Sequence, residues 1–154
     1  MLSLKLVDNN ITSDEIKLLA KWRKKVQPLW EETFEVTYEG TKKWIAGIIA
    51  NPKKMLFFVV KDGKLIGHVG YDEIRDDYCY IGNVIRGEGK SDGSMTYAVK
   101  LLINMATKFN VKNIFLSALS SNEKAIKFYE DIGFKVFIYD IKNLIMKYEN
   151  NTLV

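Results

Sequence analysis

Glycines and cations lie close together in the segment VIRGEGKSDGSM, which spans residues 84–95. Gly87, Gly89 and Gly93 are interspersed with Arg86 and Lys90. Glycine lets a backbone approach a phosphate closely, and successive backbone N–H groups in such a turn form an anion site. A long helical pattern follows, so the positive end of a helix dipole would face the same anion. An ordinary glycine-containing loop before a helix is the alternative, and this segment alone does not decide between them.

The spacing of these residues excludes two nucleotide-binding loops. The Gly-Lys-Ser at residues 89–91 resembles the end of a Walker loop, but that loop needs a glycine five positions earlier, where this chain has Val84. A dinucleotide-binding loop that starts at Gly87 needs glycine at the position of Asp92. Any phosphate held here therefore belongs to a different kind of ligand.

Hydrophobic periodicity and turn signals predict the elements that hold this loop. Thr12 and Glu15 have capping-box spacing at the start of one helix, and Asp62-Gly63 is a hairpin turn signal between two apolar runs. The predicted order is β-α-α-β-β-β-α-β-α-β-β, an α/β fold with a sheet of mixed direction. We expect strands at 2–7, 55–60, 65–71, 78–85 and 113–120 and in one or two pieces over 133–149, and helices at 11–26, 41–50, 94–109 and 122–132.

Length and composition predict one globular domain over residues 1–154. The chain has 47% hydrophobic and 27% charged residues, with a net charge of +4 that is spread along the sequence. Its single cysteine, Cys79, excludes an internal disulfide and a cysteine-based zinc site. No apolar run approaches the roughly 20 residues that cross a bilayer, and the N-terminus lacks a secretion signal pattern. We therefore expect a cytoplasmic protein that binds neither membranes nor, without basic-aromatic interleaving, nucleic acid.

A second motif, NEKAIKFYEDIGF at residues 122–134, changes the interpretation of the glycine loop. Asn122 is a predicted helix N-cap, and Gly133 is placed to end the helix. Together with Arg86-Gly87-Glu88-Gly89 upstream, this segment resembles the acetyl-CoA-binding signature of the GNAT acetyltransferase superfamily. Ser91 departs from that signature, because the family usually has Gly or Ala at its position. The likeness extends over nearly the whole chain, and LLAKWRKKV, TKKWIAGIIANP and FFVVKDGKLIGHVGYDEI resemble the branch of ribosomal-protein N-terminal and nucleotide-amino-sugar acetyltransferases.

This resemblance implies a mixed, mostly antiparallel sheet with about four helices, acetyl-CoA as cosubstrate, and a role for each matching residue. Tyr129 is similar to the tyrosine beside the thioester sulfur, a general acid for the departing thiolate. Asn122 is similar to the asparagine that bonds the pantetheine arm. Backbone N–H groups near residues 81–84 correspond to those that hold the oxyanion on the fourth strand. The implied acetyl-CoA-binding residues are Ile85, Arg86, Gly87, Glu88, Gly89, Lys90, Ser91, Gly93, Ser94, Asn122 and Phe128.

The acceptor side of the site is less defined by the sequence. Trp30, Tyr38 and His68 are candidate substrate contacts, although a lone strand histidine is more often a hydrogen-bonded or exposed side chain without such a role. Glu31, Glu32 and Glu35 form an acidic patch that either attracts an ammonium group or is a solvated loop. The general base stays unassigned, because Asp72, Glu73, Asp76 and Asp77 fit a solvated turn better than a proton relay. Cys79 is expected to pack rather than to act as a nucleophile.

We therefore predict an acetyl-CoA-dependent N-acetyltransferase. The expected acceptor is the primary amine of a small molecule, such as an amino sugar linked to a nucleotide, which attacks directly in a ternary complex. A protein N-terminal acetyltransferase and a non-catalytic acyl-CoA-binding module are the alternatives. Relatives that are dimers make a homodimer a further possibility.

Overall fold

The computed structural model describes residues 1–29 and 34–149. Within them, seven strands form one sheet in the order β1-β2-β3-β4-β5-β7-β6, in which the β4–β5 pair is parallel and the others are antiparallel. The strands are β1 (Leu2–Leu6), β2 (Met55–Lys61), β3 (Lys64–Ile74), β4 (Tyr78–Arg86), β5 (Asn113–Leu119), β6 (Phe134–Tyr139) and β7 (Asn143–Tyr148).

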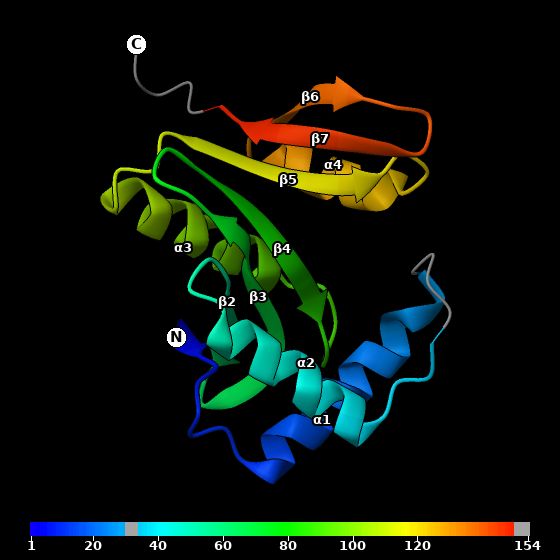
Figure 1. Cartoon of the computed structure of the whole chain (residues 1–154). Helices are drawn as coiled ribbons and strands as arrows, with labels where there is room; N and C mark the ends of the chain where they lie inside the picture. The colour runs from blue at the N-terminus through cyan, green and yellow to red at the C-terminus, as the bar shows by residue number, and fades with distance from the viewer. Residues whose placement is uncertain (30–33, 150–154) are drawn as a thin grey trace.

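Helices cover both faces of this sheet (Figure 1). On one face, α1 (Ser13–Val26) and α2 (Tyr38–Ala50) pack through Leu19, Trp22 and Ile45 on Phe58 of β2. On the other face lie α3 (Ser94–Lys108) and α4 (Glu123–Ile132), and a short 3-10 turn, η1 (Gln27–Leu29), follows α1. None of the described helices is long and apolar enough to cross a membrane. The predicted order of strands and helices is confirmed.

Local sequence signals set the ends of these elements. Thr12 accepts from the backbone N–H of Glu15, and the Glu15 carboxylate accepts from the N–H of Thr12, so the predicted capping box forms. Asp62 and Gly63 both have positive φ in the hairpin between β2 and β3. The two strands of the hairpin thereby reach the register that places His68 opposite Phe58.

The strands β4 and β5 separate along their length. They pair only where Tyr78, Cys79 and Tyr80 lie beside residues 113–115, although β4 continues to Arg86. The register between β3 and β4 also shifts in this region, where Asn83 has a φ of 55°. This is the signature of a β-bulge, which bends a strand and redirects its side chains. The bulge and the separation together open the sheet beside the glycine loop.

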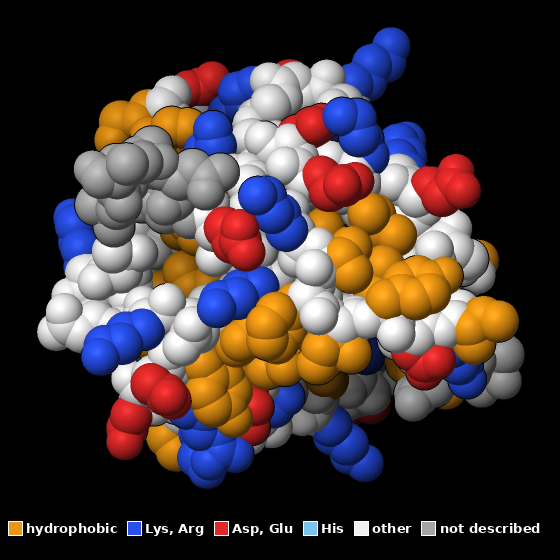
Figure 2. Space-filling model, turned by 90° about the horizontal axis from the view of Figure 1, so that it is seen from above, with side chains coloured by type: hydrophobic (Ala, Val, Ile, Leu, Met, Phe, Trp, Pro, Cys, Tyr) orange, Lys and Arg blue, Asp and Glu red, His pale blue; other side chains and the backbone are white. Residues whose placement is uncertain are grey.

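The edge strand β6 carries unusually many exposed apolar side chains. It lies at the top of the molecule in Figure 1, and Figure 2, which looks down on that side, shows hydrophobic surface among charged side chains. The exposed apolar residues of this strand and the turn after it are Val136, Phe137, Ile138, Tyr139 and Ile141.

Candidate active site

The glycine loop begins where β4 ends and forms hydrogen bonds with both β3 and α1. The backbone N–H groups of Gly87 and Glu88 donate to the carbonyl of Ile66 on β3, at 2.8 and 3.0 Å. The carboxylate of Glu88 accepts from Lys21 Nζ at 3.0 Å and from the indole N–H of Trp22 at 3.1 Å. The first half of the loop is therefore fixed by α1 and β3.

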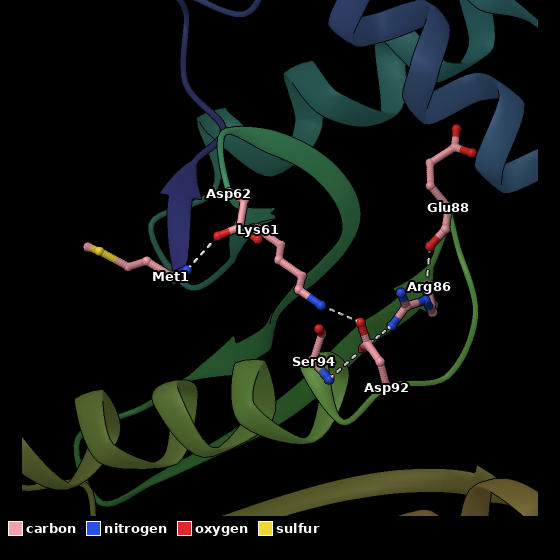
Figure 3. A network of polar contacts seen from close by, with 7 residues as sticks. All are labelled: Met1, Lys61, Asp62, Arg86, Glu88, Asp92 and Ser94. Carbon is pink, nitrogen blue, oxygen red and sulfur yellow. Dashed lines mark hydrogen bonds and ion pairs between the residues drawn. The ribbon is translucent and has the colours of Figure 1, made fainter.

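The second half of the loop carries a polar network at the start of α3 (Figure 3). The Arg86 side chain donates to the Glu88 carbonyl at 2.9 Å and to Asp92 Oδ1 at 2.7 Å. The same Asp92 oxygen accepts from the backbone N–H of Ser94 at 3.0 Å, and Lys61 forms an ion pair with the other oxygen. The Arg86 guanidinium, followed by Lys61 and Ser94, holds the pKa of Asp92 far below its usual range.

Beyond this network the loop offers unused donors. Across the described residues, the backbone N–H groups of residues 89–93 donate to no group of the chain. Gly89 and Gly93 have φ values of 77° and 86°, which favour glycine. A helix start with free N–H groups and a nearby arginine is an anion-binding arrangement. An adjoining cavity of about 310 Å³ is lined by Arg86, Ser91, Gly93, Thr96, Phe128 and Tyr129, among others.

Tyr129 lines the same cavity. Its ring packs against Phe128 and Phe134, with centroids 5.1 and 5.9 Å away. The structure shows no partner within the described chain for its hydroxyl group. Burial raises the pKa of this phenol, and the charge of Asp72 raises it further. Tyr129 therefore keeps its proton at neutral pH and can donate it, or a hydrogen bond, to a developing thiolate.

The model of the acetyltransferase (GNAT) domain family matches residues 9–152. The chain belongs to the GNAT family. Its expected class, an acetyl-CoA-dependent acyltransferase with the GNAT fold, is thereby confirmed at the level of the family. No match was found among curated proteins.

Solved structures share the GNAT fold over almost all of this chain. The N-acetyltransferase PseH of Campylobacter jejuni, in complex with acetyl coenzyme A, has a TM-score of 0.78 at 22% identity, over 98% of this chain and 100% of its own. FdhC, a nucleotide-linked sugar GNAT, has a TM-score of 0.77 at 15% identity, over 96% of this chain and 85% of its own. An acetyltransferase of Salmonella typhimurium that modifies the N-terminal serine of a ribosomal protein has a TM-score of 0.79 at 12% identity, over 97% and 95%.

Not all of the residues that resemble the GNAT signature line the cavity. Asn122 is exposed, and its side-chain oxygen accepts from the N–H of Ala125 at 3.1 Å as the N-cap of α4. Its amide NH₂ takes no part in this cap. Glu88 points toward α1, so its side chain supports the GNAT loop from behind.

Two of the three residues predicted to contact the acceptor lie among the described residues. His68 faces α1 and α2 and is fully buried between Trp22 and Trp44, so no surface of its side chain is open to a ligand in this structure. Helix packing over that part of β3 is the reason, and strand alternation does not reveal it. Tyr38 begins α2 and is half-buried beside the same core. Trp30 lies outside the described residues.

Glu31 and Glu32 also lie outside the described residues, whereas Glu35 is exposed. Asp76 and Asp77 are exposed in the turn before β4, at the opposite end of that strand from Arg86.

Asp92 was missed by the sequence analysis of the GNAT loop, although Asp-Gly-Ser before a helix is a turn signal for a side chain that bonds the backbone two residues on. Its carboxylate puts a negative charge beside the unused N–H groups at the start of α3, where it would repel a bound anion. Asp92→Asn keeps a carbonyl oxygen for Ser94, removes the charge and releases Arg86. We expect the dissociation constant of acetyl-CoA to fall roughly three- to tenfold, as measured by isothermal titration calorimetry at low salt.

Asp131→Asn is the matched control, since Asp131 forms an exposed ion pair with Lys127 on α4, at 2.7 Å. This variant removes the same charge away from the loop and is expected to change the affinity little. Weaker binding by Asp92→Asn would instead mean that Asp92 orients Arg86 for the pyrophosphate.

Proposed function

We propose that this chain transfers the acetyl group of acetyl-CoA to the primary amine of a small molecule, by direct attack in a ternary complex. The observation that carries the proposal is the cavity that joins the Arg86 loop to Tyr129. The loop and the start of α3 supply donors for a pyrophosphate, and the phenol of Tyr129 lines the same cavity, which supports its role beside the thioester.

The buried, protonated thiol of Cys79 supports direct attack by the amine. Cys79 is buried, and burial raises the pKa of its thiol to about 11. It therefore stays protonated at neutral pH and is a poor nucleophile. An acetyl-enzyme on Cys79 is disfavoured, and the amine itself would form the new bond to the carbonyl carbon.

For the acceptor, we favour an amino sugar linked to a nucleotide. The likeness to FdhC, a nucleotide-linked sugar GNAT, supports this class. A protein N-terminus is the second candidate, supported by the likeness to the Salmonella typhimurium enzyme that modifies an N-terminal serine.

The test measures free CoA with a thiol reagent after mixing the protein, acetyl-CoA and one amine at a time. Because Cys79 is buried, the protein contributes little background signal. The panel contains amino sugars, their nucleotide-linked forms, and peptides with free N-termini. Amine-dependent thiol release with a nucleotide-linked amino sugar is expected. Binding of acetyl-CoA without release by any amine would favour the non-catalytic acyl-CoA-binding module, and no binding at all would overturn both.

A further inference from the structure

Asp72 is directed to the face of the sheet opposite α3. Its neighbour Tyr71 points toward α3, since the Tyr71 hydroxyl donates to the carbonyl of Leu102 at 2.6 Å. The register of β3 against β4 shifts between Tyr71 and Glu73, so alternation alone does not set the direction of Asp72. Its carboxylate overlaps the Cβ position of Gly82, which follows the core residue Ile81 on β4 and therefore faces away from α3. On β4, Cys79 and Ile81 pack into the α3 core, which places Tyr80 on the same face as Asp72.

The carboxylate of Asp72 occupies a position prepared by β4. A side chain at Gly82 would overlap this carboxylate, so the glycine provides the space for it. Asn83 Nδ2 donates to Asp72 Oδ1 at 3.2 Å. Gly82 therefore leaves space for the Asp72 carboxylate, and Asn83 binds it from the neighbouring strand.

His68 fixes the bulge from the buried side. Its Nδ1 lies 2.6 Å from the carbonyl oxygen of Asn83. Burial lowers the pKa of His68 to about 4, so the ring is neutral, and its Nδ1–H donates to this carbonyl. Its Nε2 has no partner among the described residues. The histidine thus stabilises the positive φ of Asn83, which directs the Asn83 side chain to Asp72.

Asp72 lines an open hollow, and its charge acts on Tyr129. The hollow has a volume of about 530 Å³, and Asp72, Tyr80 and Ser117 are among its lining residues. Asp72 is exposed to solvent there, yet enough protein surrounds it for desolvation to raise its pKa, an effect that nearby Lys54 opposes. Its charge also reaches the phenol of Tyr129, which lines the other cavity.

We propose that Asp72 is the general base of the acetyl transfer and that Asn83 positions its carboxylate. This inference rests on the proposed function. The acceptor ammonium approaches through the hollow and gives one proton to Asp72. The freed amine nitrogen then forms a bond to the acetyl carbon and loses a second proton to solvent, and Asp72 releases the first proton to solvent before the next turnover. The carbon–sulfur bond breaks, its electron pair stays on sulfur, and the thiolate takes the proton of Tyr129, which solvent replaces.

The charged and titratable groups near Asp72 come from several elements. Glu73 and Arg75 bind each other at 2.8 Å, so their charges largely cancel. The groups that face Asp72 or the hollow are Lys53, Lys54, Glu73, Arg75, Tyr80 and Tyr129. Glu73 is the other carboxylate near the hollow among the described residues, and its ion pair with Arg75 keeps it from replacing Asp72.

The test compares the pH dependence of kcat/KM in three variants, with an amine that the wild-type protein acetylates. Asp72→Asn is expected to lower kcat by roughly 10²- to 10³-fold and to abolish the fall of activity at acidic pH. Asn83→Gly keeps a residue that tolerates positive φ but removes the donor, so the pKa of Asp72 should rise and the acidic limb should move to higher pH. Asp76→Asn, in the exposed turn before β4, is the matched control and should retain the wild-type profile.

A readout without substrate separates a base from a structural carboxylate. Carbon-13 carboxyl NMR of the wild-type protein, assigned with Asp72→Asn, should show that the pKa of Asp72 is raised from its ordinary value, and is higher again in Asn83→Gly. Near-wild-type kcat and an unchanged acidic limb in Asp72→Asn would overturn the inference while leaving the proposed function intact. Absence of amine-dependent thiol release by the wild-type protein would instead refute the proposed function, and the inference with it.

Discussion

Replacing Tyr129 with phenylalanine is expected to lower kcat by roughly 10²- to 10³-fold while leaving the affinity for acetyl-CoA nearly unchanged. The substitution keeps the ring between Phe128 and Phe134 and removes only the hydroxyl group, which has no partner in the described chain. Because burial and Asp72 raise its pKa, Tyr129 carries its proton throughout the neutral range. The wild-type enzyme should therefore show no loss of this acid below about pH 9.

The matched control for this prediction is Tyr148→Phe. Tyr148 is a half-buried tyrosine of β7 whose ring packs on Phe134, with centroids 5.5 Å apart. The Tyr148→Phe substitution removes a hydroxyl group from the same aromatic cluster, but from a residue that does not line the cavity. We therefore expect kcat to stay within about twofold of the wild type. Steady-state kinetics and calorimetry with acetyl-CoA measure the two effects. If Tyr129→Phe lost affinity and turnover equally, the phenol would be a binding group rather than an acid.

Replacing Gly87 with alanine is expected to destabilise the protein by about 2–3 kcal/mol and to weaken acetyl-CoA binding. A Cβ at Gly87 would overlap the indole of Trp22. That indole is fully buried and is flanked by Phe58 and His68, so it has no space into which to move. Either α1 or the loop must shift, and a shift of the loop breaks the bond between Trp22 and Glu88.

Gly47→Ala is the matched control, since Gly47 lies inside α2 and a Cβ there meets open space. The same change should therefore stabilise the protein by about 0.5–1 kcal/mol, because alanine loses less backbone entropy in a helix. Urea unfolding of both variants measures the two effects. If the free energy of unfolding changed little in both variants, α1 would move freely against the loop, contrary to the packing of Trp22.

The order of the elements was predictable because short-range signals control it. The capping box at Thr12, the Asp62-Gly63 hairpin and the N-cap at Asn122 each act within a few residues, and each forms as expected. The loop at Arg86 was predictable from its spacing to Tyr129, given the family resemblance. The structure shows that these two residues share one cavity.

The acceptor side could not be predicted, because it depends on which elements lie over each other. Alternation places His68 on the correct face but does not reveal that Trp22 and Trp44 cover it. Asp72 resembles the other acidic residues of its segment in sequence, and the irregular pairing of β3 with β4, which shifts register at Asp72 and again at Asn83, distinguishes it. A bulge changes the phase of a strand by one residue, and the hydrophobic pattern of β4 does not indicate its position.

The early separation of β4 and β5 has a kinetic consequence. The two strands pair only as far as Tyr80, and the cavity of Tyr129 and the hollow of Asp72 open on opposite faces of the sheet. With a separate route to solvent for each ligand, neither substrate blocks the entry of the other, and neither product must leave first. We expect initial rates to follow a random-order scheme, in which double-reciprocal plots intersect and free CoA competes with acetyl-CoA at every concentration of amine.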